Sequence, residues 1–281
     1  MLKAFRCQSG FLFRQKSTQL VMLVLFILVA ACYITDVFRY QGSDVIYMIH
    51  PMKLLLLSYD RVVFDATMAI ELIRLYPLLA AAAAGLACAK EKELGLDTCI
   101  RARIGGMRYS LTKLAAVFFV TTVVFLIPFL SEIVLNCVAF PMNAAGGNIG
   151  MNIYDPEYVQ AVRADLFPGL YLYSPYLYAV IRTILFALLS GVTAAFTAAL
   201  SMVVRVKYRM LYLIPPMLLF YASENSSVFH RNAGSATKWY HYIFLFDNSD
   251  RDMKTFFLVL AGLVIFSGAA AYRCGRRDCL S

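Results

Sequence analysis

The chain has 281 residues, of which 61% are hydrophobic and 15% are charged, and its mean hydropathy is +0.68. Uncharged runs of about twenty residues recur along it, and each is long enough to cross a bilayer as a helix. This composition excludes a soluble globular protein. The alternation typical of a transmembrane β-barrel is missing, so we expect an all-α integral membrane protein. The formal net charge of +9 then concerns membrane orientation, and nucleic acid is not an expected partner.

The N-terminal segment is basic and amphipathic. Residues 1–19 carry four Lys and Arg side chains and no acidic one, with phenylalanines placed among the bases. This pattern predicts a short amphipathic helix on the inner leaflet of the membrane. The apolar run that follows has no convincing signal-peptidase site before Asp36, so we expect a retained first span.

Six stretches are apolar enough to be membrane spans, and we expect them to form one transmembrane domain over residues 1–281. We expect the third span to kink or end near Pro128. The fifth is marginal, because Pro215 and Pro216 lie inside it. Residues 224–254 are amphipathic and aromatic, which fits a partly inserted helical hairpin. The approximate spans are 17–38, 68–89, 113–140, 176–204, 208–223 and 255–272.

The distribution of basic residues predicts the orientation. With six spans, both termini lie on the same side of the membrane. The segments on that side hold 16 Lys and Arg residues in 57 positions, whereas the segments on the opposite side hold 10 in 121. Since basic residues concentrate in cytoplasmic loops, we expect a multi-pass protein of the plasma membrane with both termini in the cytoplasm.

The loop between the second and third spans, residues 90–113, is the most informative stretch. It is highly charged, yet its apolar residues Leu96, Ile100 and Ile104 recur at a helical spacing, and Gly105-Gly106 should separate this helix from the next span. Two interpretations are open. The loop is either a connector that lies on lipid head groups, or a coupling helix that docks on a soluble partner.

The second span contains an alanine-rich run, Ala80–Ala84, followed by Gly85. Small residues let helix backbones approach closely. The run therefore indicates either a well-packed helix pair within the chain or a seam for helix sliding or dimerisation.

Motifs for catalysis are absent from the sequence. There is no G-x-x-x-x-G-K-[ST], no H-E-x-x-H and no G-x-S-x-G, and the histidines and cysteines follow no metal-site spacing. We therefore expect neither an enzyme nor a cofactor or metal held by this chain. Polar side chains within the spans are candidates for a translocation path, and Arg182 either reaches the outer interface or faces a polar cavity. These candidates are Arg182, Thr121, Thr122 and Tyr212.

The central stretch resembles the permease subunits of ABC-2-type exporters, in which the second span is followed by glutamates, a glycine and a basic coupling helix. The six-span layout, the basic N-terminus and a large outer segment between the last two spans also agree with that family. Gly105-Gly106 departs from the continuous helix expected there. The residues that carry the resemblance are Glu91, Glu93, Gly95, Arg101 and Arg103, with Lys113 opening the third span.

The resemblance implies a membrane half-transporter that pairs with a second permease, identical or different. ATP and Mg²⁺ would be bound by separately encoded cytoplasmic ATPase subunits, and this chain would move an unidentified substrate outward. The alternatives are a secondary transporter or channel, and a non-transport membrane enzyme or assembly factor. The expected ATPase-coupling residues are Glu91, Glu93, Gly95, Leu96, Ile100, Arg101, Arg103 and Ile104.

Overall fold

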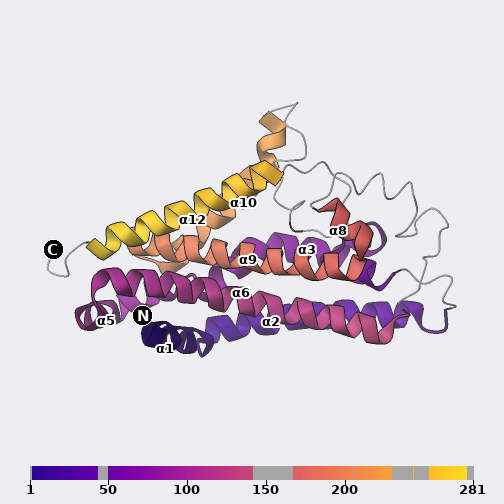
Figure 1. The fold of residues 1–281 in the computed structure, drawn as a ribbon, viewed down its shortest axis with the longest axis horizontal. Helices are drawn as coiled ribbons and strands as arrows, with labels where there is room; N and C mark the ends of the chain where they lie inside the picture. The colour runs from indigo at the N-terminus through magenta and orange to yellow at the C-terminus, as the bar shows by residue number, and fades with distance from the viewer. Residues whose placement is uncertain are drawn as a thin grey trace.

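The computed structural model describes residues 2–43, 50–141, 167–204, 206–229, 243 and 253–276. Throughout these residues the regular secondary structure is helical, and most of the long helices lie along the long axis of the molecule (Figure 1). The α-helices are α1 (Leu2–Phe13), α2 (Lys16–Tyr40), α3 (Tyr59–Ala84), α4 (Ala87–Glu93), α5 (Leu96–Ile104), α6 (Gly106–Ala139), α8 (Pro168–Tyr173), α9 (Pro175–Val203), α10 (Ile214–Phe229) and α12 (Met253–Arg276). Two 3₁₀ helices, η2 (Pro51–Leu54) and η4 (Arg209–Leu213), precede α3 and α10.

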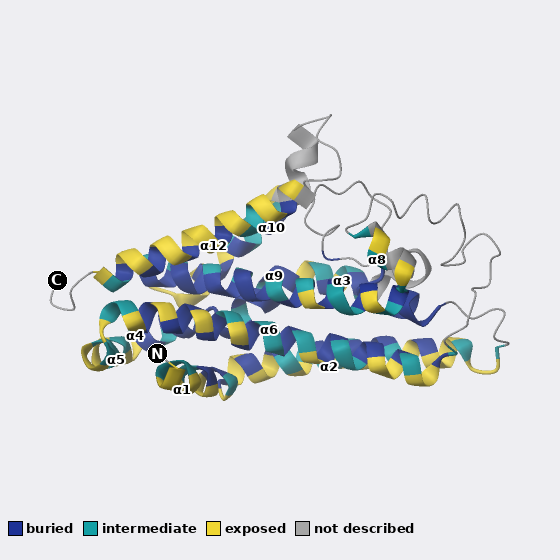
Figure 2. Cartoon of the chain, in the orientation of Figure 1, coloured by how far each residue is buried: buried dark blue, intermediate teal, exposed yellow. Residues whose placement is uncertain are grey.

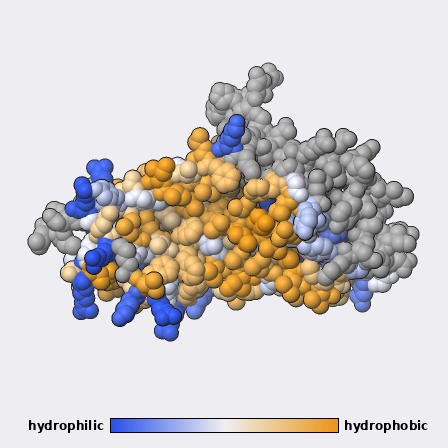
Figure 3. All heavy atoms as spheres, in the orientation of Figure 1, coloured by the Kyte–Doolittle hydropathy of each residue, from blue (hydrophilic) through white to orange (hydrophobic). Residues whose placement is uncertain are grey.

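Among the described residues, four helices are long and apolar enough to cross a membrane: α2, α6, α9 and α12. A fifth candidate is the pair α3 and α4, which passes the same test together but is bent by 46° where the two helices meet. The apolar helical stretch Arg209–Ala222 is shorter. Apolar side chains cover the middle of the molecule, and hydrophilic ones gather at the end that carries α5 (Figure 3). The expectation of an all-helical membrane protein is therefore confirmed.

The helices α9 and α12 run in the same direction. Leu185 in the first half of α9 and Phe256 at the start of α12 line one groove. Near the other ends of the two helices, the Cys274 thiol donates to the Met202 carbonyl at 3.7 Å. Since both helices end at the α5 end of the bundle, the chain between them must return along the bundle. Helix α10 makes the described part of this return, and the Tyr221 hydroxyl donates to the Arg74 carbonyl of α3 at 3.1 Å.

An aromatic cluster holds four helices together in the middle of the bundle. The ring of Tyr76 (α3) lies 5.3 Å from that of Phe186 (α9) and 5.8 Å from that of Phe220 (α10). Phe125 of α6 contacts Phe186 edge to face at 5.7 Å. Such aromatic contacts add to the stabilisation that comes from burial. The buried faces of these helices point toward one another, and the exposed faces point outward (Figure 2).

The alanine-rich run of α3 lies inside the bundle. Ala80, Ala83 and their neighbours are buried, and the Thr18 hydroxyl of α2 donates to the Ala83 carbonyl at 2.6 Å. A Cβ atom on Gly85 would lie 3.0 Å from Thr197 Cβ in α9. The small residues therefore let α3 pack closely on two helices of the same chain, which favours the internal helix pair over a seam between copies.

Among the described residues, four of the six predicted spans correspond to helices long and apolar enough to cross a membrane. The predicted span 68–89 falls on the bent pair α3 and α4, and the predicted span 208–223 falls on the shorter stretch Arg209–Ala222. The expected spans 17–38 and 176–204 coincide closely with α2 and α9. The helix α6 begins at Gly106 rather than near Lys113, and it continues through Pro128 instead of ending there. Most of the hairpin expected over 224–254 lies outside the described residues. Helix α10 covers its first part as far as Phe229, and α12 begins at Met253.

A close approach of α6 and α9 at Gly191 supplies a test of this packing. An added Cβ on Gly191 would lie 2.8 Å from the Phe118 carbonyl and 2.3 Å from the Thr122 hydroxyl. We expect Gly191→Ala to destabilise the protein by about 1–3 kcal/mol, as overpacking of a core does. Thermal unfolding in detergent measures the effect.

The matched control for this substitution is Gly262→Ala in α12, where nothing lies within 4 Å of the added Cβ. Alanine also favours a helix over glycine by roughly 1 kcal/mol, so the control should be neutral or slightly stabilising. Equal effects at the two glycines would contradict the close packing of α6 on α9.

Candidate functional site: the α4–α5 loop and the ion pair beneath it

A buried ion pair joins α4 to α6 at the charged end of the bundle. The Lys113 ammonium donates to one Glu91 carboxylate oxygen, and the Tyr109 hydroxyl donates to the other at 2.6 Å. Tyr109 and Lys113 are four residues apart, so they lie on the same face of α6. All three residues are buried, with at most 4% of their surface exposed. A charge buried in this way is strongly destabilising unless its partner is present, so the pair fixes α4 against α6.

Lys92, the next residue along α4, attaches the same helix to α9. Its ammonium donates to the carbonyls of Ser201 at 2.5 Å and Met202 at 2.8 Å. These carbonyls belong to the last turn of α9, where no further helical N–H is available to them and where the helix dipole attracts positive charge. Glu91 and Lys92 therefore connect the short helix α4 to α6 and α9, two of the candidate membrane spans.

The helix α5 is bounded by two glycines in the left-handed region of backbone space. Gly95 has φ +66° and Gly105 has φ +84°, conformations that glycine adopts without strain. The predicted break at Gly105-Gly106 is confirmed, because α5 ends at Ile104 and α6 begins at Gly106. The loop therefore consists of three helices, α4, α5 and the start of α6, joined by sharp turns.

No residue of α5 is buried in this chain. The predicted apolar stripe is partly exposed: Leu96 is 41% exposed, and Ile100 and Ile104 are half-buried. Leu94, between α4 and α5, is 61% exposed. An apolar stripe that its own chain leaves partly open is available either to lipid or to another protein.

The two predicted basic coupling residues have different positions. Arg101 faces the bundle: its guanidinium donates to the Cys274 thiol of α12 at 3.2 Å and lies 5.4 Å from the centre of the Tyr109 ring. Arg103 is exposed. Arg101 therefore attaches α5 to α6 and α12, whereas Arg103 is free to meet a partner or a head group.

The two predicted coupling glutamates also differ in their exposure to solvent. Glu91 is buried in the ion pair, whereas Glu93 is exposed and lies 3.8 Å from Arg209 of η4. Between the α4–α5 turn and the segment before α10 there is an open polar cleft of about 400 Å³. Glu93 and Gly95 line this cleft together with Lys92, Asp97, Thr98 and Tyr212. The predicted coupling residues that are accessible are thus Glu93, Gly95, Leu96 and Arg103. Glu91 is buried and holds α4 against α6 instead.

The candidate translocation residues lie at different levels of the bundle. Thr121 and Thr122 are in α6, where Thr122 donates to the Phe118 carbonyl at 2.8 Å and packs beside Gly191. Arg182 lies nine residues before Gly191 in α9, buried near the Tyr178 ring. Tyr212 lies beyond the other end of α9, where its hydroxyl donates to the Val204 carbonyl at 2.8 Å. The described residues therefore do not bring these four side chains to one cavity.

A second polar group holds the segment before α3 at the end of the bundle away from α5. Glu132 accepts the Leu56 amide at 2.5 Å and the Cys32 thiol at 3.5 Å. Burial, together with the charge of Lys53, lowers the pKa of His50 to about 4, so this imidazole is neutral at neutral pH. Its Nδ1 accepts the Met52 amide at 3.2 Å. Nowhere in the described part of the chain do three His, Cys, Asp or Glu side chains gather as a metal site.

The sequence interpretation missed three residues of the site. Lys113 was assigned only to the start of the third span, and Tyr109 and Lys92 were assigned no role. The available signal was the four-residue spacing of Tyr109 and Lys113 on a helix that continues directly into an apolar span. A lysine on that face requires an acidic partner once the helix is buried, and the acids of the loop are Glu91, Glu93 and Asp97.

The ion pair gives a direct prediction for stability. Lys113→Met removes the only ammonium that contacts Glu91 among the described residues and leaves a buried carboxylate. We expect a loss of about 3–5 kcal/mol in the free energy of unfolding in detergent. The double variant Glu91→Leu/Lys113→Met removes both charges and should recover most of this loss.

The exposed pair Glu71–Arg74, with its atoms 3.1 Å apart, serves as the control. Glu71→Gln should cost less than about 1 kcal/mol, because solvent screens exposed ion pairs. If Lys113→Met is as mild as Glu71→Gln, the buried pair does not fix α4 against α6.

The chain matches no known protein family, no curated protein and no solved structure. The functional proposal below therefore depends on the residues and geometry of this chain.

Proposed function

We propose that this chain is the membrane permease subunit of an ATP-driven exporter of the ABC-2 type, and that its α4–α5 loop docks on a separately encoded cytoplasmic ATPase. One observation carries the proposal. The helix α5 is attached to α6 and α12 through Arg101, and the helix α4 before it is attached to α6 and α9, yet α5 buries none of its own residues. A connector that only follows the membrane surface needs no such attachment.

The attachment is suited to transmitting force. Arg101 holds α5 to α6 and α12, while Glu91 and Lys92 hold α4 to α6 and α9. A partner that displaces α5 would therefore tilt several spanning helices together. A permease of this kind needs two conformations and a surface on which ATP binding elsewhere can act, rather than a catalytic residue.

The proposed topology has six crossings with both termini in the cytoplasm. The parallel direction of α9 and α12 supports a crossing between them, to which α10 would contribute. The concentration of Lys and Arg near α1, α5 and the end of α12 supports a cytoplasmic location for that end. Dimerisation with a second permease, identical or different, belongs to the same proposal.

The orientation is tested by thiol labelling in intact cells. A cysteine placed at Asn148 should react with an impermeant maleimide from outside, because the loop after α6 is predicted to be external. The exposed native Cys99 of α5 should react only after the membrane is permeabilised. The reverse pattern would contradict the proposed orientation.

Docking is tested by purifying the tagged chain from its native membrane and identifying the polypeptides that accompany it. Ile100→Asp should abolish copurification of a P-loop ATPase, because losing one apolar anchor from a buried interface costs about 2–5 kcal/mol and a buried charge adds to that cost. Arg101→Gln should have a smaller effect, since Arg101 faces its own bundle.

The control is Leu2→Asp, which places the same charge on the α1 side chain that is 82% exposed. It should leave copurification and membrane insertion unchanged. If Ile100→Asp also retains the ATPase, α5 is a lipid-surface connector and the docking proposal fails. The wild-type chain purified without partners should show no ATP hydrolysis, because it has no phosphate-binding loop.

A further inference from the structure

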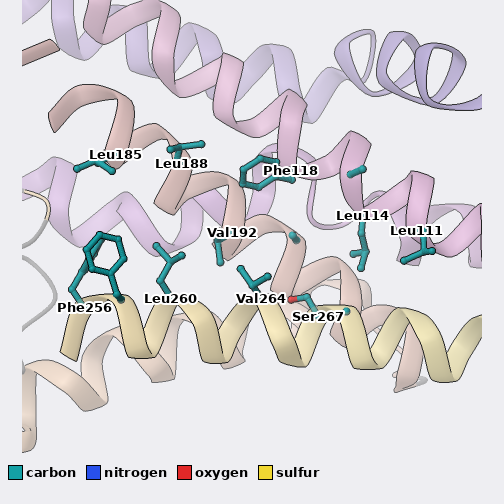
Figure 4. A pocket seen from close by; sticks show the side chains of 14 residues that line it. Leu111, Leu114, Phe118, Leu185, Leu188, Val192, Phe256, Leu260, Val264 and Ser267 are labelled. Carbon is teal, nitrogen blue, oxygen red and sulfur yellow. The ribbon is translucent and has the colours of Figure 1, made fainter. Parts of the chain in front are cut away.

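A long apolar groove lies between α6, α9 and α12, on the side of the bundle. Its volume is about 510 Å³. Leu114 and Phe118 of α6 form one wall, Leu188 of α9 forms the floor, and Leu260 and Val264 of α12 form the other wall (Figure 4). All of these helices are membrane-span candidates, so the groove faces hydrocarbon.

The groove offers nothing to bind water or a polar ligand. None of the residues that line it is charged, and its one hydroxyl group, Ser267 Oγ, donates to the Leu263 carbonyl of its own helix at 2.7 Å. The occupant that such a surface favours is therefore a hydrocarbon chain.

The length of the groove matches one leaflet of a bilayer. Its lining on α12 extends from Phe256 to Gly268, which is about 18 Å at the helical rise. Half of a hydrocarbon core is about 15 Å thick. The groove can thus take one acyl chain that lies along the helices.

Two arginines lie beyond the groove lining on the side toward α5: Arg108 is three residues before Leu111 on α6, and Arg276 is eight residues after Gly268 on α12. There α6 and α12 meet, since a Cβ on Gly106 would lie 2.8 Å from the Gly275 carbonyl. Arg108 and Arg276 follow this contact on the two helices, and both are exposed. The Arg276 guanidinium is held 4.4 Å above the Tyr272 ring. No ion pair within the described part of the chain joins either arginine to an acid.

We propose that this groove binds one acyl chain of an anionic phospholipid, whose phosphate lies on Arg108 and Arg276. The acyl chain fits the length and the apolar lining of the groove, and the phosphate, which lies beyond the lining toward α5, complements the two positive charges there. Lipid binding here is independent of the ATPase proposal, because the groove lies outside the α4–α5 loop.

The test is native mass spectrometry of the delipidated protein with added phosphatidylglycerol or phosphatidylcholine. The wild-type protein should retain one phosphatidylglycerol more tightly than phosphatidylcholine. Gly268→Leu should remove this binding, because nothing lies within 4 Å of its added Cβ and the side chain can extend into the groove. Gly262→Leu on the same helix also has open space, lies outside the groove lining and should bind as the wild type does.

The head-group contact is tested separately. Arg108→Gln and Arg276→Gln should each weaken phosphatidylglycerol binding about fivefold while leaving phosphatidylcholine binding unchanged, as expected for one basic residue at an anionic lipid. The double variant Arg14→Gln/Lys16→Gln removes two charges from the same end of the bundle and should have no such effect. Equal retention of both lipids by the wild type would overturn the proposal, as would unchanged binding in Gly268→Leu. Conversion of a protein dimer to a monomer by Gly268→Leu would assign the groove to a second copy and would also overturn it.

Discussion

The arrangement of the charged end of this protein depends on one buried ion pair, Glu91 with Lys113. Neither charge is stable alone in an apolar bundle, so the two helices that carry them must stay together. Tyr109 adds a second donor to the same carboxylate and satisfies its other oxygen. Once α4 is held against α6, the loop between them has little freedom, and α5 is held at the surface of the bundle.

The helices α3 and α4 are bent by 46° where they meet. Beyond the bend, Glu91 pairs with Lys113 of α6 and Lys92 donates to the end of α9, so these contacts stabilise the bent arrangement. Gly85 lies at this bend and packs tightly against Thr197 of α9. The charged contacts on one side of the bend and the small-residue packing on the other therefore both hold the chain in its direction after α3.

Much of the fold could be predicted from the sequence because hydrocarbon imposes a simple pattern. The runs that became α2, α9 and α12 carry few charges along their length, and Gly105 ended α5 where predicted. The errors arose where a polar residue is satisfied by a partner far away in sequence. The charge of Lys113 predicts the start of the third span there, whereas the helix α6 already begins at Gly106 and buries Lys113 against Glu91.

The candidate site was predictable as a stretch but not residue by residue. The charged loop was identified from its composition, yet composition could not show that Arg101 turns inward to Cys274 while Arg103 stays exposed. The same limit applies to the polar residues within the spans. The Thr122 hydroxyl donates to the Phe118 carbonyl of its own helix, and Arg182 lies in a different part of the bundle. The packing of α6 on α9 determines these positions, and the sequence alone does not show it.

The most direct measurement of the central claim uses the native thiol on α5. Cys99 and Cys7 are the exposed cysteines among the described residues, so Cys7→Ser leaves Cys99 as the accessible site in that part of the chain. A maleimide-benzophenone probe attached to Cys99 is irradiated in native membranes, and its adducts are identified by mass spectrometry. Docking predicts a protein adduct with a polypeptide that carries a P-loop, and its loss in Cys99→Ser. Adducts with lipid alone would contradict the account.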